Sequence, residues 1–174
     1  DSFDNPSGVI EQAPNAHGAA ASGDYLYIAD YDFGKIAVAK ITETGLEEDT
    51  TKAIDLKQAI IEHCGAVFES EYAWVHGEGI IAKDGCLFVM VNVNPKGDYY
   101  NYVDSYLMQY AVNVDGSLEY VSHTRAGKNT DVVRMNIYNN MILTTAIGGM
   151  QNYGGTIADD KDSTVPGFGN TIGN

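Results

Sequence analysis

Short strands of alternating apolar and polar residues recur along this chain, and this recurrence limits the possible folds more than any other feature. The clearest example is GDYLYIADYDFGKIAVAKI, residues 23–41, where apolar and aromatic residues fall at every second position on both sides of an Asp-Phe-Gly break. Such alternation predicts a β-hairpin with one buried face.

The hairpin pattern returns after two later turns. Asp84-Gly85 precedes CLFVMVNV and Asn139-Asn140 precedes MILTTAI, as Gly23-Asp24 precedes YLYIADY, so the turn recurs at similar intervals. The first two units continue with a third and a fourth strand. Four short antiparallel strands per unit are typical of a β-propeller blade, although a sandwich or barrel also has short strands at regular spacing. We therefore predict an all-β chain of four-stranded antiparallel sheets, forming a partial β-propeller of about three blades.

The chain divides into blade-like units and two departures from the repeat. Within a single propeller segment, 1–174, the units are expected at about 17–54, 76–125 and 126–147. Residues 55–65, DLKQAIIEHCG, predict an inserted short helix with Asp55 as N-cap and Gly65 as the stop; a distorted continuation of the strand is the alternative. The Gly-rich residues 148–174 predict a loop or tail.

The third unit stops after two strands, so its edge should be exposed or covered by a partner. The alternation also predicts which positions are buried, with the strand phase open to an error of one residue. The predicted core includes Tyr25, Tyr27, Ile36, Val38, Leu87, Val89, Leu107, Ile142 and Leu143.

The segment HGAAASGDYLYIADYDFGKIAVAKIT, residues 17–42, resembles the LVIVD-type repeat of bacterial and archaeal cell-surface β-propellers. The similarity is looser over 76–113, where PKGDYYNYVD lengthens the hairpin, and partial over 131–147. The resemblance implies an extracellular or cell-surface protein whose propeller is completed by remaining blades or by other protein chains. It identifies an architecture and no activity.

The composition excludes some partners. The chain has 24 acidic and 10 basic residues, a net charge of −14, which argues against nucleic acid because phosphate binding needs clustered Lys and Arg. No apolar run approaches the roughly 20 residues of a membrane-spanning helix.

Recognisable catalytic signatures are missing from the sequence, which has no G-x-S-x-G, H-E-x-x-H, P-loop or C-x-x-C pattern. Catalytic residues, metal and cofactor therefore stay unknown at this level. The two cysteines, Cys64 and Cys86, match no metal motif; they form either a disulfide or two separate buried thiols. The acidic run at 159–163 lacks the EF-hand pattern and predicts a solvated loop in preference to a calcium site.

Candidate ligand-binding residues come from the starts of the units. His17 and His76 are each followed by Gly and open a repeat, while Glu78 and Asp131 occupy comparable positions. In the propellers that the repeat resembles, first strands line a central channel, so these four side chains would face one site. Histidine with carboxylates can bind a cation or act as acid and base. The alternative is that both histidines are turn residues that hydrogen-bond the start of the blade.

A second candidate site is the Tyr-rich stretch GDYYNYVDSY, residues 97–106. Tyr99, Tyr100 and Tyr102 would suit a protein or glycan partner, because Tyr gives a large contact area for little entropy. Alternatively, these side chains pack on the neighbouring blade. His63 and His123 are expected to be ordinary surface residues.

Two function classes follow from these observations. The favoured one is a non-enzymatic binding or structural module of a secreted or cell-surface β-propeller protein. The alternative is a propeller hydrolase of lactonase-like type, or an oxidoreductase, with a metal at the central channel.

Overall fold

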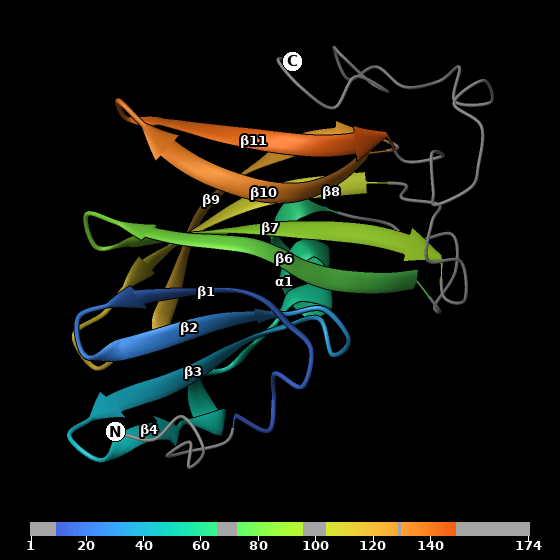
Figure 1. Ribbon diagram of the computed structural model, residues 1–174. Helices are drawn as coiled ribbons and strands as arrows, with labels where there is room; N and C mark the ends of the chain where they lie inside the picture. The colour runs from blue at the N-terminus through green and yellow to red at the C-terminus, as the bar shows by residue number, and fades with distance from the viewer. Residues whose placement is uncertain (1–9, 66–72, 96–103, 129, 149–174) are drawn as a thin grey trace.

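Three antiparallel β-sheets lie one on another in the computed structural model of this chain (Figure 1). The structure describes residues 10–65, 73–95, 104–128 and 130–148. Most of these residues are in strands, and neighbouring strands in each sheet follow one another in sequence.

The first sheet has the order β1-β2-β3-β4, with the short strand β5 also paired to β3. A single 3-10 turn, Thr50–Lys52, precedes β5. The strands are β1 (Ala16–Ser22), β2 (Tyr25–Asp30), β3 (Lys35–Thr42), β4 (Gly45–Glu48) and β5 (Ile54–Asp55).

The second sheet has the order β6-β7-β8-β9, and the third sheet pairs β10 with β11. The strands are β6 (Ala73–Lys83), β7 (Cys86–Pro95), β8 (Asp104–Val112), β9 (Leu118–Lys128), β10 (Thr130–Tyr138) and β11 (Met141–Gly148). The prediction of a mainly β chain with four-stranded antiparallel sheets is confirmed. The described sheets do not close into a ring.

A helix, α1 (Leu56–Cys64), occupies the insertion between the first two sheets. Its N-cap is Asp55, whose side chain accepts a hydrogen bond from the Gln58 backbone N–H at 2.9 Å. It ends at Gly65, whose left-handed backbone lets its N–H donate to the Ile60 carbonyl. Leu56, Ala59 and Ile60 are buried, so the helix fastens its apolar side to the sheets.

The first strands of the three sheets, β1, β6 and β10, all run in the same direction in Figure 1. Each has an irregularity in its pairing, which lies between Ala16 and Gly18, between Gly77 and Ile80, and between Val132 and Arg134. A bulge of this kind bends a strand and redirects a side chain.

The irregularities fall at matching distances before the turns that end these three strands. Glu78 follows His17 by the same interval that separates the first two turns, which begin at Gly23 and Asp84. Val133 follows Glu78 by the interval that separates the second turn from the third, which begins at Asn139. His17, Glu78 and Val133 therefore correspond to one another.

The main core lies between the first and second sheets and includes α1. Five predicted core residues are buried: Tyr27, Ile36, Val38, Leu87 and Val89. Tyr25, Leu107 and Ile142 are only half-buried. The prediction was wrong for Leu143, which is 49% exposed, because successive residues of a strand face opposite sides of the sheet and its neighbour Ile142 takes the more covered side.

The turn between β8 and β9 closes one end of this core. The buried Tyr27 hydroxyl donates a hydrogen bond to the Gly116 carbonyl at 3.0 Å. Gly116 has φ 83° and lies against the Tyr25 ring, where a Cβ atom would overlap that ring. The turn of the second sheet that contains Gly116 therefore packs on Tyr25 and is hydrogen-bonded to Tyr27, both in the first sheet.

Within the described residues, no helix is long and apolar enough to cross a membrane.

Candidate functional site

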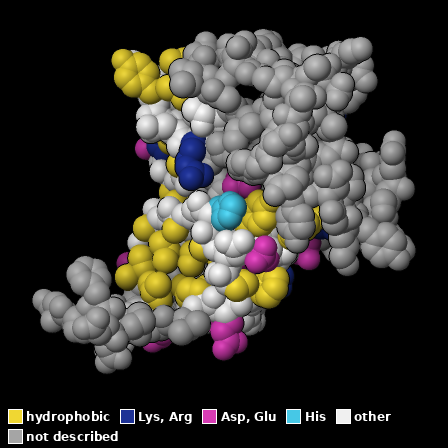
Figure 2. All heavy atoms as spheres, turned by 45° about the vertical axis from the view of Figure 1, so that its right-hand side comes forward, with side chains coloured by type: hydrophobic (Ala, Val, Ile, Leu, Met, Phe, Trp, Pro, Cys, Tyr) yellow, Lys and Arg dark blue, Asp and Glu magenta, His cyan; other side chains and the backbone are white. Residues whose placement is uncertain are grey.

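The first strands of all three sheets begin on the same side of the molecule, the right-hand side of Figure 1. Figure 2 brings this side forward and shows a histidine side chain with basic and acidic side chains close to it. The residues that meet here come from β1, β6 and β10, and we call the group of His17, Glu78 and Arg134 the first-strand site.

His17 and Glu78 form the centre of the first-strand site. The His17 Nδ1 and Glu78 Oε2 atoms are 2.8 Å apart, and they join the first sheet to the second. The side chain of His17 is 32% exposed, whereas that of Glu78 is only 4% exposed. Two matching positions of β1 and β6, both at strand bulges, thus carry complementary groups in contact.

The carboxyl group of Glu78 is perturbed by its surroundings. Burial raises the pKa of Glu78, while the hydrogen bond from His17 and the positive charges of His17 and Arg134 act in the opposite direction. The involvement of Arg134 brings the third sheet to the same point. Buried carboxylates with specific charged neighbours are concentrated at functional sites.

The His17 ring is the end of a stack of three rings, His17, Tyr31 and His76, which we call the aromatic column. The His17 ring stacks on Tyr31 with ring centroids 4.4 Å apart, and Tyr31 stacks in turn on His76 at 4.0 Å. Trp74 contacts the edge of Tyr31 at 5.8 Å and lies 4.4 Å from the His76 ring. The column holds the His17 ring in one orientation while leaving one edge accessible.

His76 belongs to this column and is fully buried. Its Nδ1 atom is 3.0 Å from the Tyr31 carbonyl, and its Nε2 atom contacts the Asn94 side-chain oxygen. Burial lowers the pKa of His76, outweighing these two hydrogen bonds. The Tyr31 carbonyl belongs to the turn between β2 and β3. Its contact with His76 is of the kind expected under the alternative interpretation of the sequence, in which this histidine hydrogen-bonds the start of the unit.

The other candidates from the sequence are placed less fully. Asp131 lies at the start of β10, opposite Ile147 of β11, and its side chain is outside what the structure describes. Tyr99, Tyr100 and Tyr102 also lie outside the described residues. Arg134 was missed, although it directly follows the position equivalent to His17 and Glu78, which was the available signal.

The chemistry of the first-strand site follows from the His17–Glu78 pair. When Glu78 is ionised, its Oε2 atom accepts a hydrogen bond from the Nδ1–H group of His17, which fixes the tautomer and leaves Nε2 as an acceptor on a side chain that is 32% exposed. Across the described ranges, neither that Nε2 atom nor Glu78 Oε1 has a hydrogen-bond partner. Nε2, on the partly exposed ring, can therefore accept a hydrogen bond from a ligand, whereas Glu78 is only 4% exposed and acts through its charge.

Groups for binding a metal are sparse in the part of the chain that the structure describes. No three His, Cys, Asp or Glu side chains there lie close enough together to hold a metal ion. Cys64 and Cys86 are both free thiols, which answers the question that their spacing left open. Burial raises the pKa of Cys64 to about 11.

His63 and His123 are not the isolated surface residues that the sequence suggested. The His63 ring of α1 stacks on Tyr120 of β9 at 3.8 Å, and the Tyr120 hydroxyl is 2.7 Å from His123 Nδ1. Both histidines are half-buried. The reason is that α1 packs close enough to β9 for aromatic stacking, which a strand pattern cannot indicate.

Comparisons of this chain with protein-family models, with curated proteins and with solved structures find no match. The interpretation of the first-strand site therefore depends on its geometry.

Proposed function

We propose that this chain is a non-enzymatic binding module, part of a β-propeller in a secreted or cell-surface protein, and that it holds a small polar ligand at the first-strand site. The observation that carries the proposal is the buried carboxylate of Glu78, contacted at 2.8 Å by a partly exposed His17. A buried carboxyl group costs free energy unless it is paired, so its presence at an accessible junction of three sheets favours a binding role.

The repeat supports the propeller part of the proposal. Three stacked sheets have first strands in one direction, with a bulge at the equivalent position of each. In a propeller such positions converge on a common axis, which makes residues distant in sequence into neighbours. The contact between His17 and Glu78, which belong to separate units, fits that arrangement. Remaining blades or other chains would complete the ring.

The ligand class follows from the free atoms of the site. His17 Nε2 accepts a hydrogen bond and Glu78 adds negative charge behind it, so the ligand should carry hydroxyl or ammonium donors. Arg134, whose charge reaches Glu78, disfavours a simple cation unless the ligand also has an acceptor. A polyhydroxylated or amino-bearing small molecule satisfies both conditions.

Nuclear magnetic resonance of the histidine rings tests this proposal. The probes are glucose and glucosamine, titrated separately into the protein at neutral pH; methylammonium chloride, a cation without an acceptor, is the comparison and should give a weaker response. At least one should shift the His17 ring resonances in a saturable way, while those of His63 and His123 serve as internal references. Glu78→Gln should weaken the response at least tenfold, because it removes the carboxylate charge.

The competing site is the Tyr-rich stretch, and a matched pair of variants separates the two. His17→Ala should abolish the response to the probes, whereas Tyr100→Ala should leave it intact. If no probe shifts His17 more than the reference histidines, or if Tyr100→Ala alone removes binding, the first-strand site is not the binding site.

A metal-dependent hydrolase or oxidoreductase is the second candidate function. It is favoured by one observation, that a carboxylate orients His17 as it would orient a general base or a metal-ligating histidine. Calorimetric titration with Zn²⁺ and Ca²⁺, together with hydrolysis of a simple γ-lactone, tests it. Metal-stimulated turnover that His17→Ala removes would replace the binding role with an enzymatic one.

A further inference from the structure

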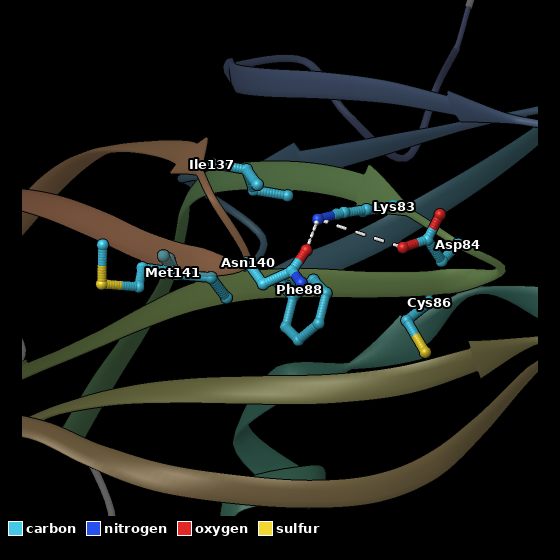
Figure 3. Close-up of a pocket in the computed structure, with 8 residues that line it drawn as sticks. Lys83, Asp84, Cys86, Phe88, Ile137, Asn140 and Met141 are labelled. Carbon is cyan, nitrogen blue, oxygen red and sulfur yellow. Dashed lines mark hydrogen bonds and ion pairs between the residues drawn. The ribbon is translucent and has the colours of Figure 1, made fainter.

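A pocket of about 310 Å³ opens between the second and third sheets, beside the turns in which β6 and β10 end (Figure 3). Its apolar side chains come from both sheets: Phe88 of β7, Ile137 of β10, and Met141 and Ile142 of β11. Concave sites with mainly apolar walls and volumes of about 300–1,000 Å³ are typical of small-molecule binding. The pocket shares no lining residue with the first-strand site, so it is a separate candidate site.

Among the residues that line the pocket, Lys83 is the only cation. Figure 3 shows its Nζ atom between the two turns, where it donates a hydrogen bond to Asn140 Oδ1 at 2.5 Å. A lysine ammonium group has three N–H donors, and within the described ranges this hydrogen bond uses one of them. Lys83 therefore offers a positive charge and further donors to a ligand in the pocket.

The neighbouring carboxylate of Asp84 leaves most of this positive charge unmatched. Its Oδ2 atom lies 4.0 Å from the Lys83 Nζ atom, and its side chain is 86% exposed, compared with 31% for Lys83. An ion pair that is so exposed contributes little free energy. A ligand carboxylate inside the pocket would pair with Lys83 more strongly than Asp84 does, because apolar walls would separate it from water.

The two turns beside the pocket hold Lys83 and Asn140 in place. Asp84 and Gly85 have φ of 51° and 75°, and Asn139 and Asn140 have φ of 45° and 63°. Two successive residues with positive φ are what a type I′ hairpin turn requires. Lys83 directly precedes one of these turns and Asn140 belongs to the other. The polar side of the pocket is therefore formed before a ligand arrives, which lowers the entropy cost of binding.

We propose that this pocket binds a small monocarboxylate with an apolar body, its hydrocarbon part against Phe88 and Ile142 and its carboxylate on the Lys83 ammonium group. The apolar side chains favour the hydrocarbon part. The single cation favours a single negative charge. A phosphate dianion or a dicarboxylate would bring a second negative charge that no other lining residue matches, in a chain whose net charge is −14.

Alkylation of Cys86 by iodoacetamide in the full chain reports on occupancy of the pocket. Cys86 lines the pocket as a half-buried free thiol. Cys64 is not a lining residue, so it serves as an internal reference when both thiols are followed by mass spectrometry. Hexanoate and benzoate are the probes. The comparison molecules are 1-hexanol, benzyl alcohol and hexylamine, which keep the apolar body and lack the carboxylate.

Saturating hexanoate or benzoate should slow the alkylation of Cys86 severalfold and leave that of Cys64 unchanged. The alcohols and the amine should need concentrations at least about tenfold higher, because they forgo a hydrogen bond between two charged groups. Equal potency of the carboxylates and the alcohols would overturn the assignment of the carboxylate to Lys83. A rate that no probe changes would overturn the whole site, including the case in which another part of the protein fills the pocket.

A matched pair of lysine variants separates charge from shape. Lys83→Met removes the charge and keeps an unbranched apolar side chain, whereas Lys40→Met makes the same change at an exposed position of β3. Lys83→Met should weaken protection by hexanoate at least about tenfold and leave protection by 1-hexanol nearly unchanged, which also shows that the variant is folded. Lys40→Met should change neither. Hexanoate protection that is the same in both variants would contradict the proposal.

Asp84→Asn gives a converse measurement that leaves Lys83 in place. Asn suits the left-handed backbone of this position, and the substitution removes the negative charge beside Lys83. Protection by hexanoate should therefore require a lower concentration, while protection by 1-hexanol should stay the same. A higher concentration of hexanoate, or an equal gain for 1-hexanol, would show that the pocket does not place a carboxylate on Lys83.

Discussion

Replacement of Gly34 by Ala should weaken the joint between the first and second sheets. Gly34 lies in the turn between β2 and β3 with φ 59°. A Cβ atom there would overlap the carbonyl oxygen of Val75 in β6, a backbone atom that cannot rotate away. Gly23 provides a matched control, because its φ is 56° and a Cβ atom would meet nothing within 4 Å.

The two glycines separate backbone strain from steric overlap. A non-glycine residue in the left-handed region costs about 1–2 kcal/mol, partly offset by about 0.4–1 kcal/mol from the reduced entropy of the unfolded chain. Gly23→Ala should therefore lower the free energy of unfolding by about 1 kcal/mol or less. Gly34→Ala adds overpacking worth about 1–3 kcal/mol, which gives a total loss of roughly 1–4 kcal/mol.

Urea unfolding measures the difference between these variants. Trp74, the single tryptophan, reports on the same joint because its Nε1 donates to the Asp32 carbonyl at 3.3 Å in the turn that contains Gly34. Its fluorescence and the far-ultraviolet circular dichroism should give the same midpoint, well below that of Gly23→Ala. Equal midpoints for the two variants would refute the reasoning, since they would show that the sheets are not packed closely at Val75.

Three further predictions concern other parts of the fold. In thermal unfolding, Tyr27→Phe should lower the free energy of unfolding by about 0.5–1.5 kcal/mol, the net value of one hydrogen bond. Tyr25→Phe keeps its ring contacts and should lower it by less than about 0.5 kcal/mol. Equal losses would contradict the role of the buried hydroxyl. Burial raises the pKa of Glu78, so above pH 4.5 the folded state keeps a proton that the unfolded chain releases. The free energy of unfolding should therefore fall as pH rises from 4.5 toward the raised pKa. Glu78→Gln should remove this decline, and parallel pH profiles of the two proteins would refute the prediction. Ellman's reagent should detect two thiols in urea without reductant, and fewer than two would indicate a disulfide. In the folded protein at pH 8, Cys64 should react slowly because its pKa is about 11.

Much of the fold is readable from the sequence, because strands with one buried face alternate with period 2 and their turns need Gly, Asn or Asp. The first two four-stranded units were recognised in this way. The helix was recognised from Asp55 and Gly65, residue types suited to its two caps. The error at Leu143 has a different origin, since Ile142 and Leu143 are adjacent and face opposite sides of the sheet, so that only one of them can point toward the more covered side.

The candidate site is only partly readable. Repeat spacing brought His17, His76 and Glu78 together as candidates, and the structure places them within one network of contacts. Their separate roles were not readable, because the burial of His76 depends on Tyr31 and Trp74 packing on it. Arg134 was missed since it directly follows the equivalent position, and a bulge shifts which residue of a strand points toward its neighbours.

The pairing of His17 with Glu78 also determines which sheets can be neighbours. A perfect copy of the first sheet stacked on itself would bring two imidazoles together, and a copy of the second would bring two buried carboxylates together, which repel each other when ionised. The difference between these two positions therefore distinguishes the first sheet from the second. It favours stacking in sequence order and penalises the pairing of like sheets from two molecules, which is a route to misassembly during folding.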